Sequence, residues 1–266
     1  PDGRSLAFSY DLAGNRRSTT ATVGGQPLAT LFTYDELNRL ETVTDPDGRV
    51  YVHGYDANGN RESLAHPNGV VTSYDFDARN RLTYLAAVSP IAGMVSSYAY
   101  TLAPTGNRTR IEEQDGTTRS YGYDPLYRLT EERVTSAPTP GSPTLWRNAF
   151  GYDPVGNRLT QERTERTGET HTVVYGYDPR DRLLTEDTTA YGWDENGNLT
   201  SKSGPDGALY VWDDENRLTA VNLANGTVIE HTYDVDGTRI RTRTTPATGP
   251  PTTVDYLVDP GHQTSA

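Results

Sequence analysis

The chain has 266 residues, of which 33% are hydrophobic, and its 36 acidic and 24 basic side chains give a formal net charge of −12. The low apolar content argues against a thick two-layer core, and the acidic balance excludes a nucleic-acid binder that relies on clustered basic residues. There is no cysteine for disulfides or thiol chemistry, and no apolar stretch approaches the roughly 20 residues of a membrane helix.

Low aliphatic content with a high net charge is also typical of disordered chains, so the other residue types must distinguish a folded chain from a disordered one. The chain has 18 tyrosines, 4 phenylalanines and 3 tryptophans, and aromatic residues favour strands. Its positive charge is carried by arginine, with Lys202 as the single lysine. Because the guanidinium fork pairs with carboxylates through two bonds, we predict a folded, β-rich chain in which arginine has a structural role.

A short pattern recurs along the whole chain: an aromatic residue, then Asp, then Asn or Gly-Asn, then Arg. About eleven units follow one another with a loose period in the low twenties of residues, with Phe76 as the fourth anchor and Tyr100 as the fifth. The structural-repeat residues are Tyr10, Asp11 and Arg16; Tyr34, Asp35 and Arg39; Tyr55, Asp56 and Arg61; Tyr123, Asp124 and Arg128; Tyr152, Asp153 and Arg158; Tyr177, Asp178 and Arg182; Trp193 and Asp194; Trp212, Asp213 and Arg217; Tyr233, Asp234 and Arg239. Such regular recurrence predicts stacked, solenoid-like units.

A second turn signal lies between the anchors. The dipeptides are Asp47-Gly48, Asn68-Gly69, Asp115-Gly116, Asp206-Gly207 and Asn225-Gly226, and they favour tight hairpin turns with positive φ. Two strands of about 5 to 7 residues and two turns fill one period, so each unit is predicted to be a β-hairpin. Three stretches interrupt the pattern, and we predict loop insertions at residues 85–97, 136–144 and 246–253 within a single array over residues 1–266.

Pairs of aromatic residues stand two apart before the turn, as in Phe32/Tyr34 and Tyr175/Tyr177, which places both rings on one face of the sheet. The residue between them is often Gly, so we expect another group to approach the opposite face closely. Rings of successive hairpins are predicted to stack on one another.

The turn residues have ordinary structural chemistry. The Asp is expected to accept a backbone N–H two residues on, and the Asn or Gly at the exit tolerates the left-handed conformation. The arginine has three candidate partners: an Asp of its own hairpin, an Asp of the neighbouring hairpin, or a tyrosine face. Acidic residues that recur at equivalent turns are more typical of architecture than of catalysis, so we predict no catalytic residue and no enzyme.

Metal binding has two weak candidates. Asp56–Asn60 and Asp194–Asn198 resemble the first half of an EF-hand loop, but its twelfth position, normally Glu, holds Pro67 and Pro205. The five histidines are scattered without paired-ligand spacing. We therefore predict no metal site and no cofactor.

Tyr-Asp-x-x-Gly-Asn-Arg-Leu at this period resembles the YD repeat of the RHS proteins, which include bacterial polymorphic toxins, Tc toxin B and C components and the animal teneurins. The resemblance implies an all-β fold of antiparallel hairpins in one continuous curved sheet, a segment of a spiral shell that in bacterial members encloses a C-terminal toxic polypeptide. Val258–His262 departs from the family's cleavage sequence, so no protease site is carried over. Pro1–Arg4 repeats Pro46–Arg49, which suggests a section of a longer strip.

Two functions are expected from this reading. The first is a non-catalytic shell segment of a secreted or surface protein, whose partners are the rest of the shell and an enclosed C-terminal toxin-like polypeptide. The alternative is a cell-adhesion or carbohydrate-binding module that uses the aromatic rows and protruding loops to bind glycans or a cell-surface receptor. Unpaired strand edges at both ends also predict edge-to-edge self-association.

Overall fold

A computed structural model describes residues 4–137, 141 and 143–258. The described residues contain strands and turns and no helix, which confirms the predicted all-β fold. The strands are β1 (Ser5–Tyr10), β2 (Arg16–Val23), β3 (Gln26–Tyr34), β4 (Leu40–Thr44), β5 (Val50–Tyr55), β6 (Arg61–Ala65), β7 (Val71–Phe76), β8 (Leu82–Ser89), β9 (Gly93–Leu102), β10 (Arg108–Glu113), β11 (Thr118–Tyr123), β12 (Leu129–Thr135), β13 (Thr144–Tyr152), β14 (Arg158–Glu165), β15 (Thr170–Tyr177), β16 (Leu183–Glu186), β17 (Thr189–Trp193), β18 (Leu199–Lys202), β19 (Ala208–Trp212), β20 (Leu218–Leu223), β21 (Val228–Tyr233), β22 (Arg239–Thr245) and β23 (Thr252–Asp255).

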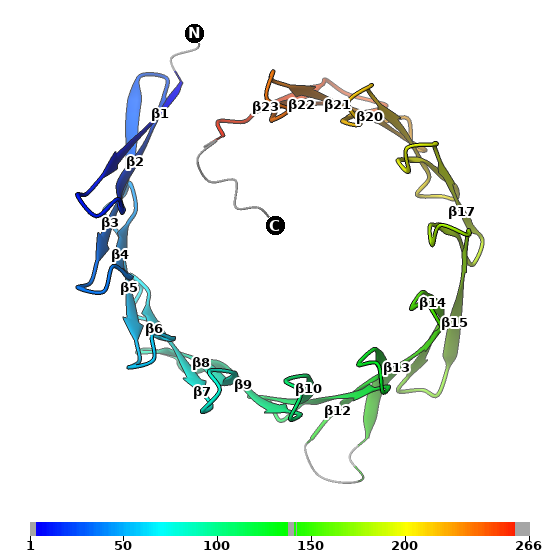
Figure 1. The fold of residues 1–266 in the computed structure, drawn as a ribbon, viewed down its shortest axis with the longest axis horizontal. Helices are drawn as coiled ribbons and strands as arrows, with labels where there is room; N and C mark the ends of the chain where they lie inside the picture. The colour runs from blue at the N-terminus through cyan, green and yellow to red at the C-terminus, as the bar shows by residue number, and fades with distance from the viewer. Residues whose placement is uncertain (1–3, 138–140, 142, 259–266) are drawn as a thin grey trace. The chain divides into compact units, whose positions relative to one another are not determined.

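The chain divides into two compact units, which are described separately. Unit 1 comprises Pro1–Phe150 and Glu162–His171, and unit 2 comprises Gly151–Gln161 and Thr172–Ala266. Within each unit, strands that follow one another in the chain lie side by side (Figure 1). In unit 1 each strand from β1 to β13 pairs antiparallel with the next, and in unit 2 the same holds from β15 to β23. The predicted hairpin repeat is confirmed.

Two of the predicted loop insertions are wrong in part. Residues 85–97 belong to the long hairpin β8–β9, whose turn covers only residues 90–92, because alternating side chains there continue the ladder. The stretch 246–253 ends in strand, since Thr252 and Thr253 begin β23 and pair with β22. Of the stretch 136–144, residues 138–140 and 142 lie outside the described residues, and Thr144 already belongs to β13.

Strands β1 to β13 of unit 1 and β15 to β23 of unit 2 pair in single ladders, so each unit is essentially one layer thick there and its core is small. The buried apolar residues of the described part are Ala86, Ile111, Val134, Tyr175, Ala208 and Val221. Val134 is the most enclosed of them, with 2% of its surface exposed. This agrees with the low apolar content of the sequence.

One face of the unit 1 sheet carries a row of half-exposed aliphatic side chains, which we call the valine face. The cross-strand register places Val52, Ala65, Val71, Val88 and Met94 side by side over β5 to β9, with Val50 in the adjoining row. Val52 is 42% exposed and Val71 38% exposed. Toward β10–β13 the same face carries ion pairs instead, such as Arg147 with Glu131 at 2.7 Å. Tyr51, Tyr55 and the other ring positions point to the opposite face, because side chains alternate along a strand.

No helix in the described ranges is long and apolar enough to cross a membrane. Within the same ranges, no group of three or more His, Cys, Asp or Glu side chains is placed to hold a metal ion.

Candidate functional site

The recurrent residues meet at turns that share one backbone design. At Asp56, the backbone N–H donates to the Asn60 carbonyl at 2.9 Å, and the Gly59 N–H donates back to the Asp56 carbonyl at 3.1 Å. Gly59 adopts φ of +87°, as predicted for the exit residue. This is a three-residue loop in which a type I turn is followed by a left-handed residue.

The second turn of most units uses the same design, and the positive φ predicted for these turns is confirmed at Gly48, Gly69, Gly116 and Gly226. In the turn of Asp47-Gly48, Asp45 pairs with Arg49 and the Gly48 N–H returns to the Asp45 carbonyl. One Gly takes the single left-handed position of this three-residue loop, and the other loop residues keep negative φ. The turn of Asp206-Gly207 differs, since Gly204 rather than Gly207 takes the left-handed conformation.

The Asp carboxylate fixes each turn from inside. Asp56 Oδ1 accepts the backbone N–H of Asn58 and of Asn60, both at 2.9 Å. The first is the bond two residues on that turn chemistry predicts, whereas the second was not foreseen. The same pair of bonds recurs at Asp11, Asp35, Asp77, Asp124, Asp178, Asp213 and Asp234.

The turns fall into two classes that alternate strictly along the chain, which sequence reasoning missed. In the glycine class the left-handed residue is Gly, and it alternates with an arginine class in which that residue is Asn, Asp or Tyr and Arg follows at once. The left-handed residues in chain order are Gly14, Asn38, Gly59, Asn80, Gly106, Tyr127, Gly156, Asp181, Gly197, Asn216 and Gly237. The signal is visible in the sequence, because Arg stands six residues after the aromatic in one class and five in the other.

Four of the glycine-class turns are bound to the next turn by an asparagine. Asn60 Nδ2 donates to its own Asp56 Oδ2 and to Oδ1 of the left-handed Asn80 in the following arginine-class turn, both at 2.9 Å. The same bridge runs from Asn15 to Asn38, from Asn157 to Asp181 and from Asn198 to Asn216. One amide thus satisfies its own turn and its neighbour.

An arginine-class turn is bound to the next turn by its guanidinium. Arg182 donates through Nε to its own Asp178 at 2.7 Å and through Nη1 to the backbone carbonyl of Asp194 at 3.0 Å. Its guanidinium also lies over the Trp193 ring, 5.9 Å from the centroid. Arg39 and Arg81 make the same two bonds, Arg39 lies over Tyr55, and Arg217 lies over Tyr233. The arginine therefore uses its own Asp and a neighbouring ring together, rather than one of them.

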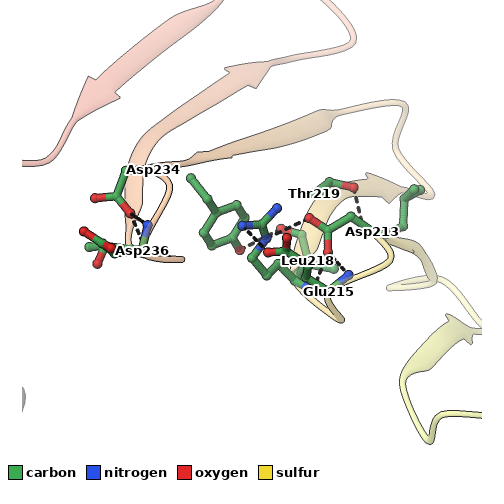
Figure 2. A network of polar contacts seen from close by, with 10 residues as sticks. Asp213, Glu215, Leu218, Thr219, Asp234 and Asp236 are labelled. Carbon is green, nitrogen blue, oxygen red and sulfur yellow. Dashed lines mark hydrogen bonds and ion pairs between the residues drawn. The ribbon is translucent and has the colours of Figure 1, made fainter.

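The repeat aromatic is a donor as well as an apolar ring. Most of these hairpins have a register shift one residue before the turn, as between Thr33 and Tyr34. Near this bulge, Leu40 offers a carbonyl that the Tyr55 hydroxyl of the next hairpin binds at 2.8 Å. Figure 2 shows the equivalent place at Leu218, whose carbonyl accepts the Tyr233 hydroxyl at 2.8 Å. Trp193 and Trp212 donate through Nε1 in the same way, which explains why Trp replaces Tyr at these positions.

The predicted stacking of one aromatic ring on another is replaced by arginine guanidinium groups that lie over the rings. Arg61 lies over Tyr74 at 4.8 Å and Arg158 over Tyr175 at 4.5 Å, each joining a hairpin to the next. A guanidinium over an aromatic face contributes roughly 0.5 to 1 kcal/mol at an exposed site. Because these ring faces are occupied, they are poor platforms for sugar rings.

The prediction that Tyr100 is the anchor of the fifth unit is wrong. The turn bonds join Ala103 to Asn107 and Gly106 to Ala103, so Leu102 holds the aromatic position and Ala103 the Asp position. Tyr100 stands two residues earlier and lies under Arg108, as Phe8 lies under Arg16. In the sequence of this segment the aromatic ring stands out more than the turn, because the turn has no Asp.

The close approach expected at the glycines between paired rings is a hydroxyl of the partner strand. A Cβ on Gly176 would stand 2.5 Å from Thr185 Oγ1, and one on Gly151 would stand 2.6 Å from Thr160 Oγ1. The bare face therefore makes room for its own Ser and Thr side chains rather than for a ligand.

The turn carboxylates make the fold sensitive to acid. The hydrogen bonds from the side chain and backbone of Arg81 lower the pKa of Asp77 to about 2, and the backbone N–H of Arg39 is the main cause that lowers the pKa of Asp35. Since the unfolded value is about 3.9, these groups stabilise the fold above pH 4 and the stabilisation is lost as the pH falls toward 2. We expect the Tm measured by circular dichroism to fall through this window, and to fall less steeply in Asp77→Asn. Equal slopes for the two proteins would contradict this assignment.

Tyr55→Phe is expected to lower the free energy of unfolding by about 1 kcal/mol, because the Leu40 carbonyl loses its donor while the ring is kept. Tyr51→Phe is the matched control, since no hydrogen bond of the Tyr51 hydroxyl is found among the described residues of the same strand and face. Urea unfolding followed by circular dichroism measures both. Equal losses for the two variants would remove the proposed role of the hydroxyl.

The turns and ladders define a β-hairpin repeat protein, and comparisons with known proteins agree. The RHS Repeat family model matches residues 34–71 and 55–90. The chain is 33% identical over 221 residues to the tRNA3(Ser)-specific nuclease WapA of Bacillus spizizenii and 32% identical over 238 residues to the tRNA nuclease WapA of Bacillus subtilis. These matches cover 82% and 88% of the chain but only 9% and 10% of the two relatives.

Solved structures share the fold. The crystal structure of TcdB2-TccC3 without its hypervariable C-terminal region matches 98% of the chain with a TM-score of 0.53 and 15% identity, and the chain covers 18% of it. The Tc holotoxin pore of Photorhabdus luminescens matches 92% of the chain with a TM-score of 0.51 and 16% identity, and the chain covers 17% of it. The chain is an RHS/YD-repeat protein.

Proposed function

We propose that the chain is a non-catalytic wall segment of an RHS-type shell that encloses a polypeptide cargo, a toxin domain encoded further along the same gene. The relatives named above as nucleases and the Tc toxin structures support a place among secreted or surface-borne toxins. The recurrent carboxylates support a structural role, because each one is already used by its turn.

The observation that carries the proposal is the valine face of unit 1. A one-layer sheet has no other element to cover Val52, Val71 and the neighbouring aliphatic side chains, and exposed apolar rows of this kind mark surfaces that meet another polypeptide. An enclosed chain that is kept from folding offers apolar segments to such a row. The valine face is therefore assigned to the cargo side of the wall.

Accessibility in the full-length parent protein tests the proposal. Ser73 lies on the valine face and Thr72 on the opposite face of β7, and the absence of native cysteine in this region makes single Ser73→Cys and Thr72→Cys variants easy to compare. We expect a bulky polymer-linked maleimide to modify the Thr72→Cys protein and to spare the Ser73→Cys protein, while a small maleimide modifies both. In the isolated 266-residue chain the bulky reagent should modify Ser73→Cys too. Rapid bulky labelling of both variants in the parent would overturn the proposal.

Adhesion or carbohydrate binding is the weaker candidate function. The ring faces that would hold sugars lie against arginines, as with Arg39 over Tyr55. A glycan array with the native chain, read against a variant that lacks the segment around residues 136–144, remains the direct test of that candidate.

A further inference from the structure

Neighbouring hairpins of the sheet differ in length, and in places a side chain takes the position of a missing strand residue. In unit 2, Asp187 lies in the turn of the short hairpin β16–β17, and its backbone N–H donates to the Val174 carbonyl at 2.8 Å. Its carboxylate accepts the Val174 N–H, also at 2.8 Å. Ser203 binds both backbone groups of Ala190 in the same way. A strand end that extends past its neighbour is therefore completed by a side chain at these two places.

Strand β9 also extends past its neighbour, and it is completed only in part. Strands β8, β9 and β10 lie side by side in unit 1 (Figure 1), and β9 begins well before the residue that pairs with Glu113, the last residue of β10. Gln114 follows with two hydrogen bonds, from its backbone N–H to the Ser97 carbonyl and from Nε2 to the Met94 carbonyl, both at 3.1 Å. No described strand pairs with residues 93–96 on the side of β10. We call these four residues the β9 overhang.

A cleft lies along the β9 overhang. It has a volume of about 390 Å³ and is lined by residues 95–98 and by residues 113–115 of the β10–β11 turn. Four strand residues span roughly 13 Å, so the edge has room for a short extended peptide segment but not for a whole hairpin. Met94 is 42% exposed and Val95 is 54% exposed, so apolar side chains flank this edge.

Two features prevent a long strand from pairing with the overhang. Val95 is the extra residue of a bulge in the pairing of β8 with β9, and a bulge interrupts a regular ladder. The Gln114 side chain also occupies the Met94 carbonyl. Both devices protect an edge against the long strand of another copy. A short segment can still bind, because it needs few main-chain bonds and has to displace a single side-chain amide.

The surroundings of the cleft indicate the chemistry of its occupant. Met94 belongs to the valine face, which is assigned to the cargo, so an apolar side chain of the bound segment would continue that row. At the other end of the cleft, Glu113 is neutralised by Arg119 at 2.7 Å, whereas Asp115 is an exposed carboxylate. The cleft therefore favours an extended apolar segment with a basic residue beside it.

We propose that the β9 overhang is a docking site for a short extended segment of the enclosed cargo. The segment pairs with the overhang through main-chain hydrogen bonds and displaces the Gln114 side chain from the Met94 carbonyl. This inference rests on the proposed function, because it names the place where the wall holds a cargo that is kept from folding.

Two synthetic peptides test the chemistry of the edge in the 266-residue chain. The first alternates valine and threonine between terminal lysines, and the matched control carries an N-methyl group on every valine and threonine, which removes the main-chain donors and keeps the side chains. We expect the first peptide at saturation to slow amide hydrogen exchange in residues 93–97 at least about fivefold, and the control to leave it unchanged. Equal protection by both peptides, or by neither, would overturn the proposal.

Gln114→Ala separates main-chain pairing from simple apolar contact. The variant lacks the side-chain amide that competes for the Met94 carbonyl, so it should bind the valine-threonine peptide about threefold to tenfold more tightly than the native chain. Unchanged or weaker binding would contradict the displacement of Gln114.

The full-length parent protein tests the identity of the occupant. Exchange in residues 93–97 should be at least about fivefold slower in the parent than in a parent without its toxin domain, while exchange in β3 and β4 shows that unit 1 is intact. Equal exchange would overturn the cargo as the occupant. The labelling of Ser73→Cys judges the shell proposal separately, because Ser73 lies on β7 and outside the overhang. Protection of residues 93–97 in the peptide-free chain that disappears on dilution would assign the edge to a second copy instead.

Discussion

Asp56→Ala is expected to lower the Tm of the isolated chain by about 5 °C. The substitution removes the acceptor of three hydrogen bonds at once, from the Asn58 and Asn60 backbone and from Asn60 Nδ2, and leaves the turn without its internal support. Circular dichroism at neutral pH gives the measurement.

The fifth hairpin supplies the matched reverse substitution. Ala103 already stands at the Asp position, with its turn bonds to Asn107 and Gly106 in place, so Ala103→Asp is expected to raise the Tm. A chain in which Asp56→Ala has no effect, or in which Ala103→Asp destabilises, would show that the carboxylate does not support the turn.

Val134→Ala is expected to lower the free energy of unfolding by about 2 kcal/mol, because it opens a gap at the most enclosed apolar position of a thin sheet. Val134 lies opposite Trp146 and Arg119 in the neighbouring strands. Val52→Ala is the control, since Val52 is 42% exposed and its truncation should cost less than about 0.5 kcal/mol. Equal costs in urea unfolding would mean that the sheet has no localised core.

The hairpin array could be predicted from the sequence because its signals are local. An Asp that accepts nearby N–H groups and a residue that tolerates positive φ define a turn without reference to the rest of the chain, as Asp35 and Asn38 show. The period then fixes two strands per unit. Composition likewise indicated a thin core, since too few aliphatic residues are present to fill a second layer.

Other features depend on contacts between hairpins, and such contacts could not be predicted from the sequence. Whether a ring meets another ring or an arginine depends on the lateral offset of successive strands, which the bulges set, and hence Arg61 over Tyr74 was not foreseen. Proline and small residues suggested a loop at residues 85–97, but cross-strand pairing of Leu85 with Tyr98 keeps the segment in the ladder. The alternation of turn classes can be predicted from the spacing between the aromatic residue and the arginine. Its structural role depends on the hydrogen bond from Asn60 to Asn80, which only the folded structure shows.

The coupling between Asn60 and Asn80 tests most directly that the turn residues join neighbouring hairpins. A double-mutant cycle with Asn60→Ala and Asn80→Gly removes each amide, and Gly keeps the left-handed position of residue 80 free of strain. We predict from urea unfolding a coupling free energy of about 0.5 to 1 kcal/mol between the two side chains. Strict additivity of the two single variants would contradict the account, because each turn would then stand alone.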